Sequence, residues 1–142
     1  MYWYIRGAAK YKDKLYDDIS DLGDQISLHI VKLLLFSDSA YAGHWMHEIW
    51  AFLHRMQKLK NTKKLPKAKF IYDALSCSND IIDSLVKEAI ETEVELKPRD
   101  IAEVDILATL ENYQHWLSDK LSSDGYVSQE DVKSKLTELI LN

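Results

Sequence analysis

The sequence predicts an all-α protein, a single-domain bundle of five or six helices around an apolar central helix at about residues 24–36. Two observations lead to this prediction. Apolar residues recur at helical spacing along most of the chain, with no β-type alternation of any length. Turn-forming residues are scarce, since the 142 residues include four Gly and two Pro, and this favours a few long helices over many short strands. With 46% hydrophobic residues, we expect one helical domain over residues 1–142 with one core.

The first helical pattern covers roughly 8–22 and keeps its apolar residues on one face. Gly23 either ends this helix or is carried through it. The next stretch, 24–36, reads "DQISLHIVKLLLF", and its apolar side chains cover most of the helix circumference. A helix of that kind is normally enclosed by other helices, so we expect 24–36 to be the central helix of the bundle.

A turn, "SDSAYAG", separates the central helix from a third helix at about 41–60. Either Ser37 or Ser39 would cap that helix, because a serine hydroxyl accepts a hydrogen bond from a free amide at a helix start. "NTKKLPK" then interrupts the helical pattern. Pro66 suits the first turn of a new helix and disfavours helical conformation in the residue before it.

The fourth helical stretch covers 67–95, as one helix or as two pieces divided at "SCSND". In the second case Ser78 or Asn79 would cap the later piece. We expect Pro98 to open a fifth helix over 99–122, and a short last helix to run to about 141. Ser128 and Asp131 have the spacing of a capping box at the start of that last helix.

The third helix contains the densest group of reactive side chains, "GHWMHEIWAFLHRM" at 43–56. On a helical wheel at about 100° per residue, His47 and His54 lie nearly opposite the apolar face, His44 lies on the polar half near Glu48, and Trp50 lies at the boundary. The core face consists of Trp45, Ile49, Phe52, Leu53 and Met56. We therefore interpret the histidines as polar-face residues that meet solvent, another helix or another subunit.

An alternative is a metal-binding bundle, or a metal-dependent enzyme, whose ligands come from this segment. The candidate metal ligands are His44, His47, Glu48 and His54. Zinc requires three or four ligands, and imidazole is a good one. Metal sites inside bundles commonly use Glu-x-x-His pairs, which this chain lacks, and the zincin pattern fails because Ala51 stands where a second His is required. The leading interpretation therefore includes no cofactor.

Charge is unevenly distributed along the chain, although the net charge is −5. The stretch 55–69 carries seven basic residues and no acid, whereas 80–105 carries nine acids against three bases. A second alternative is accordingly a nucleic-acid accessory protein that uses the basic loop Lys58–Lys69, with binding that weakens as salt rises. The acidic total opposes that alternative, and we do not favour it.

Aromatic residues provide the other candidate contacts. The N-terminal "MYWYI" makes 1–7 an aromatic arm that either packs over the bundle or meets a partner, since Tyr and Trp are favoured at interfaces. The predicted partner-binding residues combine these aromatics with the basic stretch: Trp3, Tyr4, Trp50, Arg55, Lys58, Lys63, Lys64 and Lys67.

Nothing in the sequence assembles a catalytic constellation. We therefore predict a non-enzymatic protein-interaction or regulatory module of the adaptor, inhibitor, immunity or antitoxin type, with a protein partner or a second copy as its ligand. No stretch approaches the roughly 20 apolar residues needed to cross a bilayer, so we expect no membrane association. The lone Cys77 fits a reducing environment, and we expect a cytoplasmic location.

Overall fold

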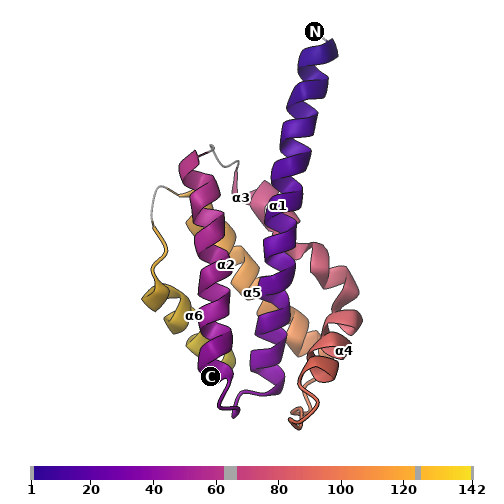
Figure 1. Ribbon diagram of the computed structural model, residues 1–142, viewed down its shortest axis with the longest axis vertical. Helices are drawn as coiled ribbons and strands as arrows, with labels where there is room; N and C mark the ends of the chain where they lie inside the picture. Colours follow the sequence, from indigo (N-terminus) through magenta and orange to yellow (C-terminus); the bar gives the residue numbers. More distant parts are fainter. Residues whose placement is uncertain (1, 63–66, 124–125, 142) are drawn as a thin grey trace.

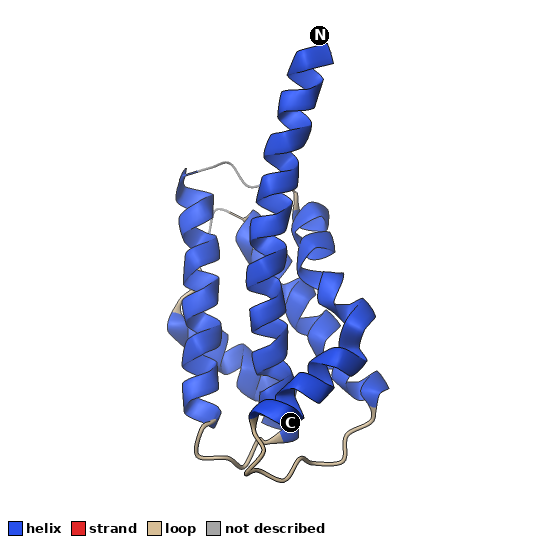
Figure 2. Cartoon of the chain, turned by 45° about the vertical axis from the view of Figure 1, so that its right-hand side comes forward, coloured by secondary structure: helices blue, strands red, loops and turns tan. Residues whose placement is uncertain are grey.

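The computed structural model describes the backbone of residues 2–62, 67–123 and 126–141, and the side chains of 14–59, 67–123 and 126–140. Throughout these ranges the chain consists of helices joined by turns and short loops, which confirms the predicted all-α bundle (Figure 2). The elements, in chain order, are α1 (Tyr2–Leu35), α2 (Ala42–Thr62), α3 (Ala68–Leu75), a 3-10 helix η1 (Ser76–Ile81), α4 (Ile82–Thr92), α5 (Glu103–Ser122) and α6 (Gln129–Leu141).

Helix α1 is one continuous helix, so Gly23 is carried through it and does not end it. Gly23 lies where α3 comes closest to α1. A Cβ atom added there would lie 3.1 Å from Leu75 Cδ2 and 3.2 Å from Leu75 Cα. Glycine therefore lets the two helices approach more closely than any other residue would allow.

The second half of α1 is the centre of the bundle, as the sequence predicted. Its residues 30–36 are buried on all sides. Around this helix pack α2, α3, η1, α4 and α5 (Figure 1). Burial of these large aliphatic side chains, each contributing roughly 1.5–3 kcal/mol, is the main source of the bundle's stability.

The stretch 67–95 forms two α-helices with η1 between them. The expectation that Ser78 or Asn79 caps the later helix is wrong, because both side chains bond to other helices. Ser78 Oγ donates to Ser27 Oγ of α1 at 3.0 Å. The Asn79 and Gln114 side-chain amides exchange two hydrogen bonds of 2.8 Å each. Tertiary contacts thus use the polar groups that would otherwise cap α4.

The prediction that Pro98 opens the fifth helix is also wrong, since α5 begins at Glu103. The backbone N–H of Arg99 donates instead to the carbonyl of Leu35 at 2.7 Å, and its guanidinium donates to Ser37 Oγ at 2.8 Å. Residue 99 is therefore engaged at the C-terminal end of α1, where carbonyls lack partners within the helix. This engagement keeps 93–102 out of helical conformation.

The capping interactions at the other predicted helix starts are partly as expected. Ser128 Oγ accepts from the Asp131 N–H, and the Asp131 carboxylate accepts from the Ser128 N–H, both at 3.1 Å, which confirms the capping box of α6. These bonds lower the pKa of Asp131. Ahead of α2, Ser39 Oγ accepts from the Tyr41 N–H at 3.0 Å, whereas Ser37 bonds to Arg99.

The two ends of the bundle differ in which segments they bring together. The N-terminal end of α1 extends beyond the other helices, on the same side as the end of α2 and the start of α3 (Figure 1). The turn 36–41 and the loop 93–102 lie together at the opposite end, which we call the basal end (Figure 2). No helix in the described part of the chain is both long and apolar enough to span a membrane.

Candidate interaction surface

Helix α2 places its predicted core face against the bundle. Trp45, Ile49, Leu53 and Met56 are each at most 3% exposed, and Phe52 is half-buried. The same rotation turns His47 toward α6 and leaves His44 exposed to solvent.

The four candidate metal ligands do not converge. His44 Nε2 lies 3.5 Å from Glu48 Oε1 in an exposed pair. The His47 and His54 rings instead lie on either side of Trp50, with ring centroids 6.0 Å and 5.2 Å from it. Across the side chains that the structure describes, no group of three or more His, Cys, Asp or Glu residues could hold a metal ion. The metal alternative therefore lacks a ligand set in this arrangement.

The stripe of α2 that carries His47 faces α6. Gln57 Nε2 donates to the Val127 carbonyl at 3.0 Å, while Gln57 Oε1 accepts from the Val127 N–H at 2.8 Å. One helical turn beyond Trp50, His47 Nδ1 lies 3.5 Å from Gln129 Nε2. Much of the polar face of α2 is therefore covered by α6, and we call this contact the α2–α6 seam. Trp50 Nε1 and His54 Nδ1 are both buried.

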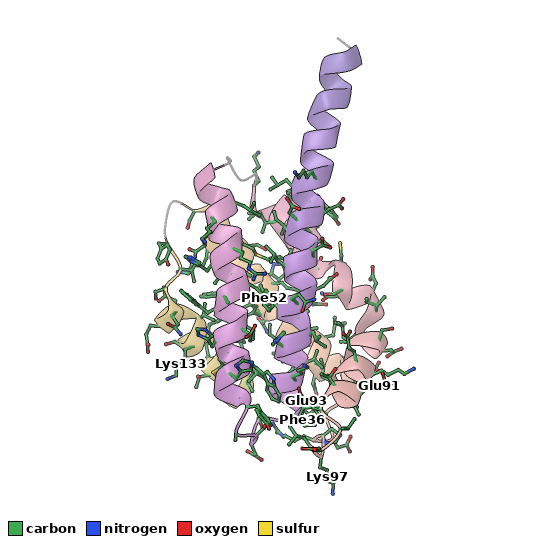
Figure 3. The ribbon with its side chains drawn as sticks, in the orientation of Figure 1. Phe36, Phe52, Glu91, Glu93, Lys97 and Lys133 are labelled. Atoms are coloured by element: carbon green, nitrogen blue, oxygen red, sulfur yellow. The ribbon has the colours of Figure 1, made fainter. Side chains whose placement is uncertain are left out.

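A small hollow opens at the outer end of this seam. It has a volume of about 190 Å³ and is lined by Gly43, Met46, His47, Gln129 and Lys133. Lys133 lies on the outer side of α6 (Figure 3). The lining contains one ammonium group and no carboxylate, and its apolar part is the half-buried Met46.

The predicted partner-binding residues are spread over two regions. Arg55, Lys58 and Lys67 are exposed on α2 and just before α3, and the Arg55 guanidinium lies 5.6 Å from the Phe52 ring centroid. Lys63 and Lys64 lie outside the described residues. Trp3 and Tyr4 belong to α1 by their backbone, but their side chains lie outside the described ones. Trp50 is half-buried at the α2–α6 seam, away from this basic end.

The basal end contains a surface that the sequence did not single out. A hollow of about 260 Å³ lies between the start of α2 and the end of α4. It is lined by Tyr41, Thr92, Glu93, Val94, Glu95 and Leu96 and is called here the basal hollow. Two of its lining side chains are strongly exposed, Tyr41 at 54% and Val94 at 78%. Large side chains exposed together in this way are typical of interaction sites.

A second hollow of about 200 Å³ adjoins the basal hollow, and Leu96 lines both. It is lined by Leu35, Phe36, Ser37, Asp38, Ser39, Leu96, Lys97 and Arg99. The Phe36 side chain lies at the base of the bundle, whereas Lys97 extends away from it (Figure 3). The two hollows together give the basal end an apolar floor with charged groups around it.

The loop that forms these hollows is held in place by two anchors. Lys32 Nζ lies 3.3 Å from Glu93 Oε1, and their side chains are 8% and 19% exposed. Arg99 is the second anchor, through its bonds to Leu35 and Ser37 at the end of α1. Both anchors connect the segment to the C-terminal end of α1 or the turn after it, and Val94 between them is turned outward.

Negative charge is concentrated along the same segment, 80–105. Hydrogen bonding to Asp83, together with the negative charge of that side chain, raises the pKa of Glu103. Two carboxyl groups from α4 and α5 therefore crowd one another at the surface. Val104, beside Glu103, is 70% exposed. The sequence shows this stretch as rich in acids, and the isolated valines within it are the only signal of the exposed apolar surface.

Comparisons with protein-family models, with curated proteins and with solved structures found no match to this chain. The function proposed below therefore depends on the geometry of its own residues.

Proposed function

We propose that this bundle is a non-enzymatic protein-interaction module, of the adaptor, inhibitor, immunity or antitoxin type, which holds a partner at its basal end. The observation that carries the proposal is the exposure of Tyr41 and Val94 around a hollow at the end of a rigidly anchored loop. Exposed apolar groups that surround a concave site gain hydrophobic free energy when a partner covers them.

The anchoring of the loop supports the same function. A binding surface that is already ordered loses less conformational entropy on association than one that must become ordered. Lys32 and Arg99 both use strong charged or charge-assisted contacts to order a segment that has no regular secondary structure of its own.

The experiment is a comparison of partner capture by three forms of the tagged chain: the wild type, Val94→Asp and Val104→Asp. The two variants exchange equally exposed valines for the same charge, but only Val94 lines the basal hollow. We expect stoichiometric capture of a partner from the native host by the wild type and by Val104→Asp, and loss of that partner from Val94→Asp. Equal capture by all three forms would place the contact elsewhere and contradict the proposal.

A further inference from the structure

We infer that the segment bound at the basal hollow carries an apolar side chain flanked by lysines or arginines. This inference rests on the proposed function, and it adds the chemical class of the partner. It follows from the charges, the apolar surface and the position of the basal end within the molecule.

The charges available to a partner at the basal end are mostly negative. Glu93 is neutralised by Lys32, whereas the guanidinium of Arg99 bonds only to neutral groups of Leu34 and Ser37 and keeps its charge. The other exposed charges are the carboxylates of Asp38, Glu95 and Asp100 and the ammonium of Lys97. Neither these four groups nor Arg99 has an ion pair among the described residues. Three carboxylates against two cationic groups leave one negative charge in excess, which favours a cationic partner.

The apolar part of the surface determines what must lie between those cations. Tyr41 and Val94 both line the basal hollow, and Leu96 continues its floor into the adjoining hollow. A volume of about 260 Å³ accommodates one large aliphatic or aromatic side chain. Such an anchor, surrounded by charged contacts, is the usual arrangement of a protein-interaction site.

The carboxyl pair of Asp83 and Glu103 adds two acidic groups, from α4 and α5, to the same acid-rich segment. Hydrogen bonding to Asp83, and then the repulsion between the two like charges, raises the pKa of Glu103. This negative charge attracts a cationic partner at the basal hollow, whereas it repels an anionic surface such as nucleic acid or an acidic membrane.

A second copy of the chain is the less favourable occupant. The end of α2 and the start of α3, which carry the described basic residues of the stretch 55–69, lie at the end of the bundle opposite the basal end (Figure 1). A contact between the acidic end of one copy and the basic end of the next joins two different surfaces, so it produces rings or open filaments and not a two-fold symmetric dimer. We therefore assign the basal hollow to a separate protein.

The test uses a synthetic amphipathic peptide of lysines and leucines as the probe. Two matched peptides replace all lysines by glutamate or all leucines by serine. Each is titrated into the full chain by calorimetry, and the contact is located by backbone amide chemical shifts. We expect the lysine–leucine peptide to bind at 94–96 and around Tyr41, and the glutamate and serine forms to bind at least about tenfold more weakly.

Variants of the chain then locate the charge contribution. Asp38→Lys/Glu95→Lys should weaken binding of the lysine–leucine peptide by roughly tenfold, which corresponds to about 1.4 kcal/mol. Asp119→Lys makes the same kind of change at an exposed acid near the far end of α5, and should change the affinity by less than about twofold. Val94→Ser, which adds no charge, should weaken binding several-fold and so measures the apolar contact separately.

Three results would overturn the inference. One is peptide binding that the double variant leaves unchanged, and another is the absence of any binding by the wild type. The third is salt-sensitive filament formation by the chain alone that Glu95→Lys abolishes, because a second copy would then be the occupant. Partner capture that depends on Val94, combined with no peptide binding, would leave the interaction function intact and refute only the basic partner.

Discussion

Lys32 shows how one residue combines two tasks. Its position within the apolar central helix places a charged group among aliphatic side chains, and the ammonium is tolerated because Glu93 lies 3.3 Å away. The same pair attaches the basal loop to α1. A buried pair of this kind contributes less to net stability than to position, because both charges lose their water.

Removing one partner of this pair should therefore cost more than removing both. We expect Lys32→Met to lower the free energy of unfolding by about 2–3 kcal/mol, since it leaves the Glu93 carboxylate only partly hydrated. Glu93→Gln should cost a similar amount. Urea unfolding of the wild type, the two single variants and the double variant Lys32→Met/Glu93→Gln makes up a double-mutant cycle, which measures the coupling between the two groups. A double variant as unstable as the sum of the singles would show that the two groups are not coupled.

His29 is expected to make stability depend on pH. Burial lowers the pKa of His29, although the hydrogen bond to the Gln25 carbonyl acts in the opposite direction. Among the nearby charges, Lys32 and His44 also lower this pKa, and Glu48 raises it. The unfolded chain then binds the proton more readily than the folded chain as pH falls below about 6.5. The contribution is thus complete above that pH and is lost as the pH falls from there toward the lower folded pKa.

The measurement is the urea midpoint at several values between pH 7.5 and pH 5, for the wild type and His29→Gln. We expect the decline with acidification to be shallower in the variant. Exposed His115, on α5, provides the control, and His115→Gln should retain the slope of the wild type. Parallel curves for the wild type and His29→Gln would contradict the assignment.

At the scale of the elements, helix propensity and packing act in opposite directions at the glycines. Alanine is a better helix former than glycine by about 1 kcal/mol. Replacing a helical glycine by alanine should therefore be stabilising where the added methyl group contacts no neighbouring atom. Gly43, in α2, has no atom within 4 Å of an added Cβ, whereas at Gly23 the nearest atoms include the backbone of Leu75. Backbone within a packed helix moves aside less readily than the end of a side chain.

We therefore predict opposite signs for one substitution at two sites. Gly43→Ala should raise the free energy of unfolding by up to about 1 kcal/mol, and Gly23→Ala should lower it by a similar amount because α1 and α3 must separate. Thermal and urea unfolding of both variants provides the comparison. Stabilisation by Gly23→Ala would mean that the α1–α3 contact can relax without loss of packing.

At the scale of the whole molecule, the described helices share one core, because α1 contacts most of the others directly. We expect residues 1–142 to unfold in a single cooperative transition, as a single domain should. Three buried or half-buried tryptophans report on different places: Trp45 and Trp50 on α2, and Trp116 on α5. In variants that retain only Trp45 or only Trp116, tryptophan fluorescence should give the same urea midpoint as far-UV circular dichroism. Separate midpoints would indicate more than one unfolding unit.

The fold was predictable because helical periodicity, burial and helix capping are local properties of the sequence. The central helix 24–36, the core face of α2 and the capping box at Ser128 all follow from the spacing of residues in one segment. Neither the start of α5 nor the roles of Ser78 and Asn79 could be obtained in this way. Their hydrogen-bond partners belong to helices distant in the sequence.

The sequence by itself determined that this protein is a helical bundle, which helix lies at its centre, and that basic and acidic residues occupy separate segments. Only the tertiary structure decided what the charged and aromatic segments face. His47 and His54 of α2 flank Trp50 at the seam with α6, and Val94 is presented outward beside Tyr41 from the turn before α2. The physical reason is that periodicity fixes the direction of a side chain relative to its own helix, whereas the neighbour it meets depends on how distant helices pack.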